Sequence, residues 1–575
     1  VRVWRNKGSA GFEERTAALG FDKLKTARVS NLCAADFDRD GDTDFLLAQE
    51  AGGLQLLSNE GGNANGQVKI DLVGHKSNAS GIGIRIEAAS GGLRLSRRVD
   101  RLPIEIGVGS HKQIESLVAH WSDANVNYTD LKVDAASLLA IDELTVPAGS
   151  CPYLYAWDGA RFRFVTDLLG AAPLGLPVSE GRVIDSDPDE YVWIGDESMF
   201  PAREGYYVLQ ITEELREVLY LDEAKLIVVD HPPGTEVHTT GKLVPGKPFP
   251  HHELITLHNR QPLVRAVNHT GVDVTGLLQQ VDRKRVSPTK LRATQLRGQA
   301  EPHSVTLDFG TLRTDKPLVL ALTGWLRFGG GTANIAASLE PDMPFPFPVL
   351  EVECNGKWSP VPVVTGAPAG KTKSIVIDLA GKLPTDARRL RLTAAFEIHW
   401  DRVALFEKRD NSETRITSLA PDFTDLHWRG FSEFKDLPWH EPLTPDYDQV
   451  FSQARWTITP SGWCTRYGEV SELIAQRDNA LALINGGDEL TLKFASSPVP
   501  LKPSSATRDF FLWSVGWDKD ADFHCVRGSE VEPLPWHGMD DQKYGREQRP
   551  PFAGDKLMQK YNTRWVGPHT FTKNR

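Results

Sequence analysis

The stretch from Asp36 to Asp44 reads Asp-Phe-Asp-Arg-Asp-Gly-Asp-Thr-Asp, and it decides how the first part of the chain is interpreted. Carboxylates alternate with other residues, so the first three share one side of a tight loop, and Gly41 permits the sharp turn that follows them. A calcium ion collects about six to eight oxygen ligands in loops of this kind. The sequence therefore predicts a Ca²⁺ site with these ligands: Asp36, Asp38, Asp40, the backbone carbonyl of Asp42, and Asp44.

The predicted loop differs from an EF-hand. Leu47 stands where an EF-hand has its bidentate glutamate, and the short apolar run 45–48 follows in place of a long amphipathic helix. The alternative interpretation is an acidic surface turn. Without a cation, so many like charges within a few ångströms repel one another, which favours the calcium interpretation.

The flanking residues predict strands joined by this loop. Residues 29–35 and 45–48 read as two strands, and 52–62 as a third that ends in a glycine-rich turn. The opening residues 1–12 repeat the design of apolar alternation, asparagine and glycines. Residues 1–66 thus resemble the FG-GAP (VCBS-type) repeat, the calcium-loop blade of integrin-like β-propellers.

Two blade-like units cannot close a propeller, which needs about four to eight blades. The chain begins at a strand whose open edge has no evident protection against pairing. We therefore expect upstream blades in a longer precursor, or another protein chain, to pack on residues 1–60. The alternative is that later domains fold back over this edge.

Residues 67–148 change in pattern. The pieces Gly-Ile-Gly-Ile-Arg-Ile at 81–86, Ile-Gly-Val-Gly at 106–109 and the segment 114–123 occur in the order of the ASPIC/UnbV domain, which this region resembles. That domain follows FG-GAP blades in cartilage acidic protein and in many secreted bacterial proteins. Ser122 replaces the usual proline. The glycines are interpreted as strand ends and bulges, because no helix follows them as a phosphate-binding site requires.

The sequence predicts a further β domain over residues 149–235. Asp158-Gly159 marks the turn of a hairpin over 153–165. Residues 206–211 and 224–230 read as strands, and 212–218 as a short helical stretch between them. The region 236–299 is interpreted as linker and strands.

That linker region contains His251, His252 and His258. The spacing does not match a zinc-protease helix, because position 256 is threonine, so these histidines are interpreted as polar surface residues.

Residues 300–408 carry alternating or β-branched runs separated by turns, a pattern typical of a β-sandwich. In its pattern of strands and turns, the region resembles the jelly-roll, galactose-binding-like class. Trp325, Trp400 and Asp401 are candidates for ligand contact at a loop end. The alternative, which we prefer, is that the tryptophans belong to the core.

Residues 409–575 hold eight of the fifteen tryptophans. Long irregular stretches are expected to cover other domains, and 469–484 is predicted as the one sizeable helix. Asp518, Asp520 and Asp522 repeat the alternating carboxylates, but Phe523 stands where the calcium loop has glycine. A second calcium site there is the weaker alternative.

Composition narrows the class. At 575 residues the chain is expected to form several domains, and its 37 Pro and 49 Gly favour a mainly β, multidomain protein. A formal charge of −11 argues against nucleic acid as a partner. No apolar run approaches the roughly 18 residues of a transmembrane helix. Five dispersed cysteines exclude a zinc ribbon but allow one or two disulfides.

No motif for a nucleophile elbow, a nucleotide loop or haem attachment occurs, so no catalytic residue is named. We expect a non-catalytic, extracytoplasmic calcium-binding scaffold or interaction subunit of bacterial type, since free calcium is abundant outside the cytoplasm. The alternative is a carbohydrate-binding or carbohydrate-active protein. A pocket with an exposed tryptophan and two nearby carboxylates would favour this alternative.

Overall fold

The computed structural model describes residues 1–568 apart from 26–27, 75–76, 123–125, 130–132, 135–137, 144–151, 293–296, 341–346, 436, 453, 455, 457 and 523. For 126–129 and 133–134 it describes the backbone alone. The chain divides into two compact units, Val1–Thr145 and Val146–Arg575.

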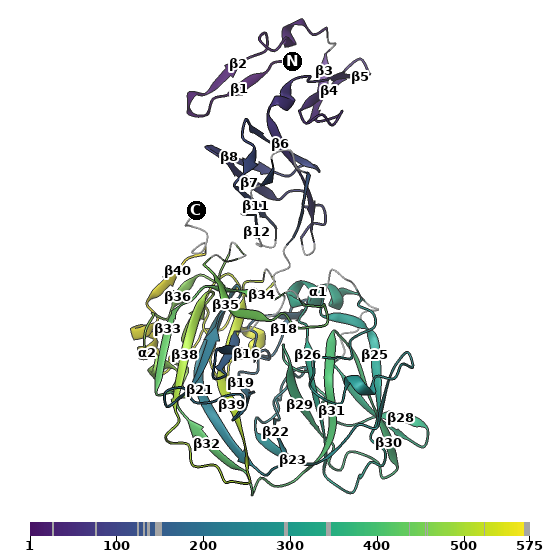
Figure 1. Cartoon of the computed structure of the whole chain (residues 1–575), viewed down its shortest axis with the longest axis vertical. Helices are drawn as coiled ribbons and strands as arrows, with labels where there is room; N and C mark the ends of the chain where they lie inside the picture. The colour runs from purple at the N-terminus through teal and green to yellow at the C-terminus, as the bar shows by residue number, and fades with distance from the viewer. Residues whose placement is uncertain are drawn as a thin grey trace. The chain divides into compact units, whose positions relative to one another are not determined.

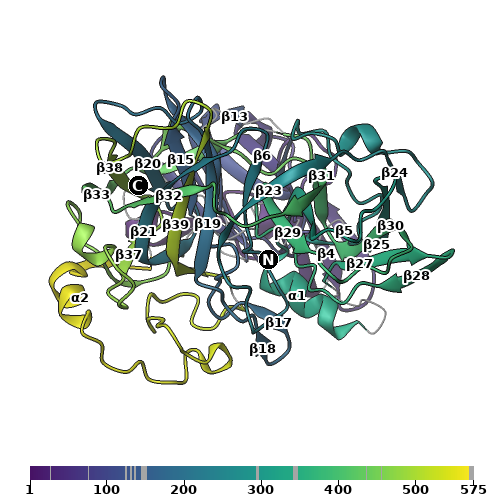
Figure 2. The same ribbon diagram turned by 90° about the horizontal axis from the view of Figure 1, so that it is seen from below.

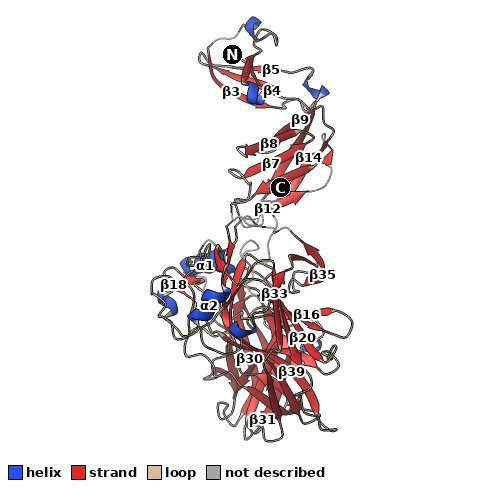
Figure 3. Cartoon of the chain, turned by 90° about the vertical axis from the view of Figure 1, so that its left-hand side faces the viewer, coloured by secondary structure: helices blue, strands red, loops and turns tan. Residues whose placement is uncertain are grey.

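The chain is mainly β, as predicted (Figure 3). In the described part of the chain the α-helices are α1 (Gly330–Leu339) and α2 (Asp555–Tyr561). Neither has the length and hydrophobicity of a membrane-spanning helix.

The first unit begins with two small antiparallel sheets (Figure 1). One pairs β1 (Trp4–Asn6) with β2 (Phe12–Glu14), and the other has the order β3 (Val29–Ala35), β4 (Asp44–Gln49), β5 (Leu54–Leu57). The acidic stretch connects β3 to β4, so the predicted strand–loop–strand arrangement is confirmed.

The rest of the first unit is built on two sheets around one apolar core. One sheet has the order β14 (Leu138–Asp142), β6 (Gly66–Val73), β9 (Ile104–Gly109). The other has the order β12 (Val126–Thr129), β11 (Ser116–His120), β7 (Arg85–Ser90), β8 (Leu93–Arg98). A short pair, β10 (Gln113–Ile114) and β13 (Val133–Asp134), lies beside them. The predicted alternation is confirmed in β6, whose Val68, Ile70 and Leu72 are buried in this core.

The second unit contains two β-sandwiches. The first packs two sheets around a large core. One sheet has the order β16 (Phe162–Asp167), β15 (Tyr153–Trp157), β20 (Tyr206–Thr212), β38 (Asp488–Ala495), β33 (Phe423–Trp428). The other has the order β19 (Asp189–Asp196), β39 (Thr507–Asp520), β21 (Glu217–His231), β32 (Arg415–Leu419), and β37 (Ala482–Asn485) also pairs with β21. Each sheet therefore combines strands that are far apart in sequence, since β20 pairs with β38 and β21 pairs with β39.

Three short strand pairs flank this sandwich: β17 (Pro177–Ser179) with β18 (Arg182–Val183), β34 (Phe431–Phe434) with β35 (Pro445–Phe451), and β36 (Gly462–Cys464) with β40 (Arg564–Val566). Residues 415–520 of the tryptophan-rich region supply strands of both sheets, and the chain after β39 packs on the sandwich. Val531, Trp536 and Tyr561 from this end are buried in its core.

The second sandwich spans residues 236–408. One sheet has the order β22 (Glu236–Thr239), β23 (Leu254–Gln261), β31 (Ile398–Lys408), β26 (Leu318–Leu326), β29 (Lys373–Asp378). The other has the order β24 (Arg265–Asn268), β25 (Gln299–Asp308), β30 (Ala387–Phe396), β27 (Val349–Cys354), β28 (Lys357–Pro360). The strands predicted within 300–408 are present, and strands from 236–268 complete both sheets.

The two sandwiches meet through one sheet of each. A small apolar cluster joins β21 and β39 to β22 and β23: Ile227, Val229, Val237, Leu254 and Phe511. Seen from below, β21, β39 and β19 lie beside the strands of the second sandwich (Figure 2). This cluster holds the facing sheets together next to the cavity described below.

Two predicted helical segments are wrong. Residues 469–484 form a one-turn 3₁₀ helix at Ser471–Leu473 and then β37, and 212–218 close β20 and open β21. In the first segment Val470, Leu473 and Leu481 are all buried in the sandwich core. Backbone pairing of β37 with β21 takes precedence over local helix propensity, which is a weak determinant by comparison.

Candidate functional sites

The acidic loop between β3 and β4 brings three carboxylates together. Asp36, Asp38 and Asp40 each place one oxygen within 4.8 Å of the others. Within the residues that the structure describes, no other cluster of His, Cys, Asp or Glu has this metal-binding geometry. The turn requires left-handed backbone at Arg39 (φ 66°) and at Gly41 (φ 100°), a conformation that glycine adopts without steric cost.

The carboxylate of Asp36 is buried and hydrogen-bonded. Its side chain is 0% exposed, and its Oδ2 accepts hydrogen bonds from the Gly41 amide (3.1 Å) and from Lys69 of β6. Burial opposes ionisation, but Lys69 and the Gly41 amide outweigh it and lower the pKa of Asp36. Its Oδ1 is buried and has no hydrogen-bond partner among the described residues. A buried anionic oxygen without a partner is costly, and a bound cation would remove that cost.

Asp42 and Asp44 connect the loop to the turn after β5. Oδ2 of Asp42 accepts from the amides of Gly62 (2.8 Å) and Asn63 (3.1 Å). The carboxylate of Asp44 accepts from the amides of Phe37 (2.9 Å) and Asn59 (2.8 Å). The side chains of Asp42 and Asp44 therefore lie outside the three-carboxylate group and fix the shape of the loop. The ligand predicted at residue 42 is its backbone carbonyl, which these side-chain contacts leave available.

The outer carboxylates of the group are crowded by like charges. The side-chain amide of Asn63 donates to Oδ2 of Asp40 (2.9 Å). Even so, desolvation and repulsion from Asp38 and Asp42 raise the pKa of Asp40. A set of carboxylate oxygens held this close is chemically suited to a hard divalent cation such as Ca²⁺.

The other sequence candidates do not form sites of this kind. His252 pairs with Asp187 (2.9 Å) and His258 is buried in β23, so the interpretation of both as surface residues is wrong. Asp518 and Asp520 lie inside the long strand β39, where no metal-binding cluster is found among the described residues.

Two tryptophans of the second sandwich are structural. Trp325 and Trp400 are buried in the sandwich, and Asp401 beside them is fully buried. The preferred interpretation of a core role is thus confirmed. The described cysteines, Cys33, Cys354, Cys464 and Cys525, are free thiols, and Cys151 lies outside the described residues.

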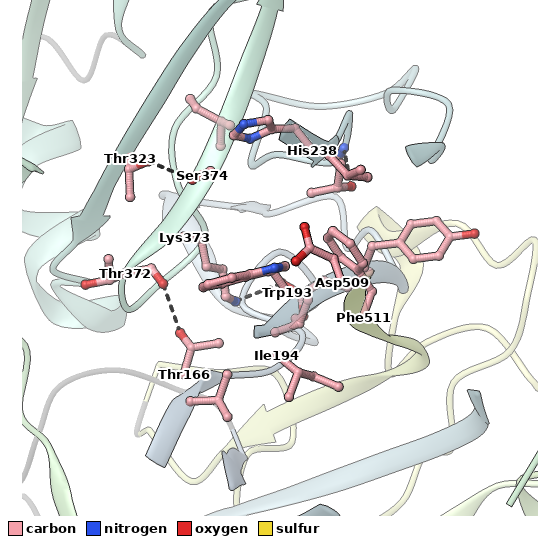
Figure 4. A pocket seen from close by; sticks show the side chains of 18 of the residues that line it. Thr166, Trp193, Ile194, His238, Thr323, Thr372, Lys373, Ser374, Asp509 and Phe511 are labelled. Carbon is pink, nitrogen blue, oxygen red and sulfur yellow. Dashed lines mark hydrogen bonds and ion pairs between the residues drawn. The ribbon is translucent and has the colours of Figure 1, made fainter. Parts of the chain in front are cut away.

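The second unit contains a cavity of about 610 Å³ where the two sandwiches meet. Its lining comes from β16, β19 and β39 of the first sandwich and from β22, β26, β29 and β31 of the second. Figure 4 shows Trp193 and Asp509 inside it, with Thr323, Ser374 and Lys373 also projecting into the pocket. This volume lies in the range of small-molecule binding sites in proteins.

Several charged side chains around the cavity form ion pairs. Lys373 binds Glu190 (2.7 Å) and Asp167 (3.1 Å). His252 binds Asp187, and although burial opposes protonation, this contact raises the pKa of His252.

A second charged group lies on the β22 side. Glu236 accepts two hydrogen bonds from Arg402 (2.8 and 2.6 Å) and one contact from His238 (3.1 Å). Burial opposes ionisation there too, but these partners lower the pKa of Glu236 to about 2. Glu236 and Arg402 therefore form an ionised pair at the cavity wall at neutral pH.

Sequence reasoning missed this cavity. Its lining residues come from segments between Arg163 and Phe511 that become neighbours only when distant strands pair. The one local signal is the alternation in β19, where Val192 and Ile194 are buried and Trp193 between them is exposed.

No protein-family model matches the chain, and no curated protein sequence matches it either.

Proposed function

We propose that this chain is a non-catalytic, extracytoplasmic calcium-binding scaffold or interaction subunit, built from FG-GAP/VCBS-like blades and an ASPIC/UnbV-like domain. The observation that supports calcium binding is the three-carboxylate group with the buried, unpartnered Oδ1 of Asp36. Calcium suits this loop because it accepts flexible, all-oxygen coordination, whereas Mg²⁺ requires a tighter octahedral shell.

Calcium in this role is structural. The loop joins two strands of a small sheet whose only fully buried apolar side chain is Leu47. Little apolar burial is available there to stabilise the sheet, so a cation that holds the loop to the turn after β5 would contribute a large share of the stability.

Removing the calcium ligands is expected to abolish calcium-dependent stabilisation. Wild-type protein should melt several degrees higher in calcium than in chelator, since a ligand at about one hundred times its dissociation constant adds about 2.7 kcal/mol. The variant Asp38→Ala/Asp40→Ala should melt at the same temperature in both. Differential scanning calorimetry of the full chain measures this, with Mg²⁺ as a second cation.

The control Asp22→Ala/Glu50→Ala removes the same charge from exposed positions of the same unit and should keep the calcium response. A wild-type melting curve that chelator does not shift would show that the stretch is only an acidic turn.

The partner surface that we propose is one face of the β3–β4–β5 sheet. The register places Cys33, Leu46 and Leu56 side by side, with Ala48 beside Leu54. Leu54 is 71% exposed and Leu56 51% exposed. An apolar sheet face and edge of this kind favour contact with another polypeptide on residues 1–60.

Charge on this face is expected to release the partner. Leu54→Glu/Leu56→Glu should leave the calcium-dependent melting unchanged, while native mass spectrometry of material from the source cells loses the associated chain. Leu501→Glu, at an exposed position of the second unit, should retain it. A wild-type protein that is isolated alone would contradict this assignment.

A further inference from the structure

The walls of the cavity where the two sandwiches meet are fixed by the fold. The apolar cluster that includes Val237 and Phe511 clamps the facing sheets beside it. Val192 and Ile194 anchor β19 in the core of the first sandwich, so the exposed side chain between them projects into the cavity. A preformed cavity loses little conformational entropy when it binds a ligand.

The lining holds more carboxylates than lysine and arginine side chains. The carboxylates are Asp187, Asp189, Glu190, Asp196, Glu236 and Asp509, and the cations are Arg163, Lys242, Lys373 and Arg402. Lys373 is bound by two carboxylates and Arg402 by Glu236. The ammonium of Lys242 donates to the carbonyls of Val364 (2.8 Å) and Val376 (3.0 Å), and burial lowers its pKa to about 8. The excess of carboxylates repels a phosphate or carboxylate ligand, so the lining favours a ligand without negative charge.

The lining nevertheless offers many hydrogen-bonding groups. The hydroxyls of Thr323 and Ser374 lie 2.7 Å apart at the cavity wall, and a hydroxyl both donates and accepts. Asp509, whose carboxylate lies 3.4 Å from His231, adds an acceptor on another side. A purely apolar ligand would desolvate these groups without replacing their hydrogen bonds, which is unfavourable.

An exposed aromatic ring completes the lining. Trp193 is 46% exposed and its indole lies inside the pocket (Figure 4). Because an indole offers a flat apolar face, it packs against the C–H face of a sugar ring while the ring hydroxyls point outward to polar groups. Few other uncharged ligands combine a flat apolar face with hydroxyls around the edge.

We propose that this cavity binds a neutral saccharide of one or two sugar units, with Trp193 as the stacking platform and Asp509, Thr323 and Ser374 as hydrogen-bonding groups. The volume of about 610 Å³ is sufficient for a ligand of this size. This assignment involves the second unit alone and does not depend on calcium binding by the acidic loop.

Isothermal titration calorimetry of the full chain tests the proposal with glucose, galactose, mannose, cellobiose, maltose, lactose, mannobiose and xylobiose. At least one of these neutral sugars should bind with a 1:1 stoichiometry. For that sugar, Trp193→Ala should weaken binding by tenfold or more, and Asp509→Asn by threefold or more.

Two controls separate the site from other effects. Trp565→Ala removes a tryptophan of similar exposure (56%) outside the cavity and should change affinity by less than twofold. Asp38→Ala/Asp40→Ala should leave sugar binding unchanged, so failure of the calcium proposal stays distinguishable from failure of this one.

Several results would overturn the proposal. The first is that no sugar of the panel binds. The second is that wild type and Trp193→Ala bind the sugar equally well. The third is that glucuronate or sugar phosphates bind more tightly than the neutral sugars. Preferential binding of a fatty acid would also overturn it, by showing that the cavity takes apolar chains.

Discussion

Replacing Glu397 with alanine is expected to lower the stability of the second sandwich by about 3 to 5 kcal/mol, the usual cost of removing one partner from a buried ion pair. The Glu397 side chain is fully buried just before β31. Its Oε2 accepts from Nε of Arg297 (3.0 Å) and from the amide of Gly298 (2.9 Å), and its Oε1 lies 3.3 Å from Nε of Arg327.

The reason for the large effect is the charge that the substitution leaves behind. Burial raises the pKa of Glu397, but its partners, with His399 and Arg297 foremost, outweigh burial and lower it to about 2. The carboxylate is thus ionised at neutral pH and compensates two guanidinium groups. Burial already lowers the pKa of Arg327 to about 10 with the carboxylate present, so losing the anion leaves a strongly disfavoured cation.

Hydrogen exchange of peptides from β26 and β31, followed by mass spectrometry, measures the loss of stability locally. A loss of 3 kcal/mol corresponds to exchange more than about one hundredfold faster, since each 1.4 kcal/mol is a factor of ten. Glu353→Ala is the control, because its pair with Arg389 (2.5 and 2.9 Å) lies at the surface and should contribute less than about 1 kcal/mol. A change below tenfold for Glu397→Ala would contradict the prediction.

Patterns that act within a few residues were predictable from the sequence. The alternation of Val68, Ile70 and Leu72 predicted a half-buried strand, and the structure confirms it. The spacing of Asp36, Asp38 and Asp40 around Gly41 predicted that three carboxylates would meet in a loop between strands, which is also observed. Both follow from geometry that neighbouring residues determine by themselves.

Features that depend on distant pairing were not predictable in this way. The segment 469–484 was predicted as a helix, yet its last residues belong to β37, which pairs with β21 more than two hundred residues earlier in the chain. The cavity has the same origin, since Trp193 and Asp509 come from strands β19 and β39 that pair across the whole second unit. Sequence patterns of single strands do not specify which strands become neighbours.

The acid stability of the second sandwich is expected to depend on His399. The imidazole is fully buried and stacks on Trp325, with ring centroids 4.5 Å apart and planes 12° from parallel. Burial lowers its pKa from 6.5 to about 4, and Arg327 and Arg285 add to this, although Glu397 at 3.5 Å opposes it. The ring is therefore neutral in the folded protein at pH values where the unfolded chain is already protonated.

The sign follows from proton binding. Between pH 6.5 and about 4 the unfolded state binds the proton and the folded state does not, so stability falls as the pH is lowered through this window. The contribution of His399 is complete above pH 6.5. About 3 kcal/mol of it is lost by pH 4, because each pH unit across the window is worth about 1.4 kcal/mol.

Substitution of His399 should therefore have an effect that shrinks in acid. His399→Gln and His399→Phe are both expected to be destabilising at pH 7.5, because each disturbs the stack on Trp325 or the contact of Nδ1 with Ser287 (2.8 Å). The difference in unfolding free energy from wild type should then decrease by about 3 kcal/mol between pH 7 and pH 4 for both variants. Pulse proteolysis in urea, scored on fragments from β26 and β31, gives that difference at each pH. A difference that stays constant across the window would contradict a lowered pKa of His399 in the folded protein.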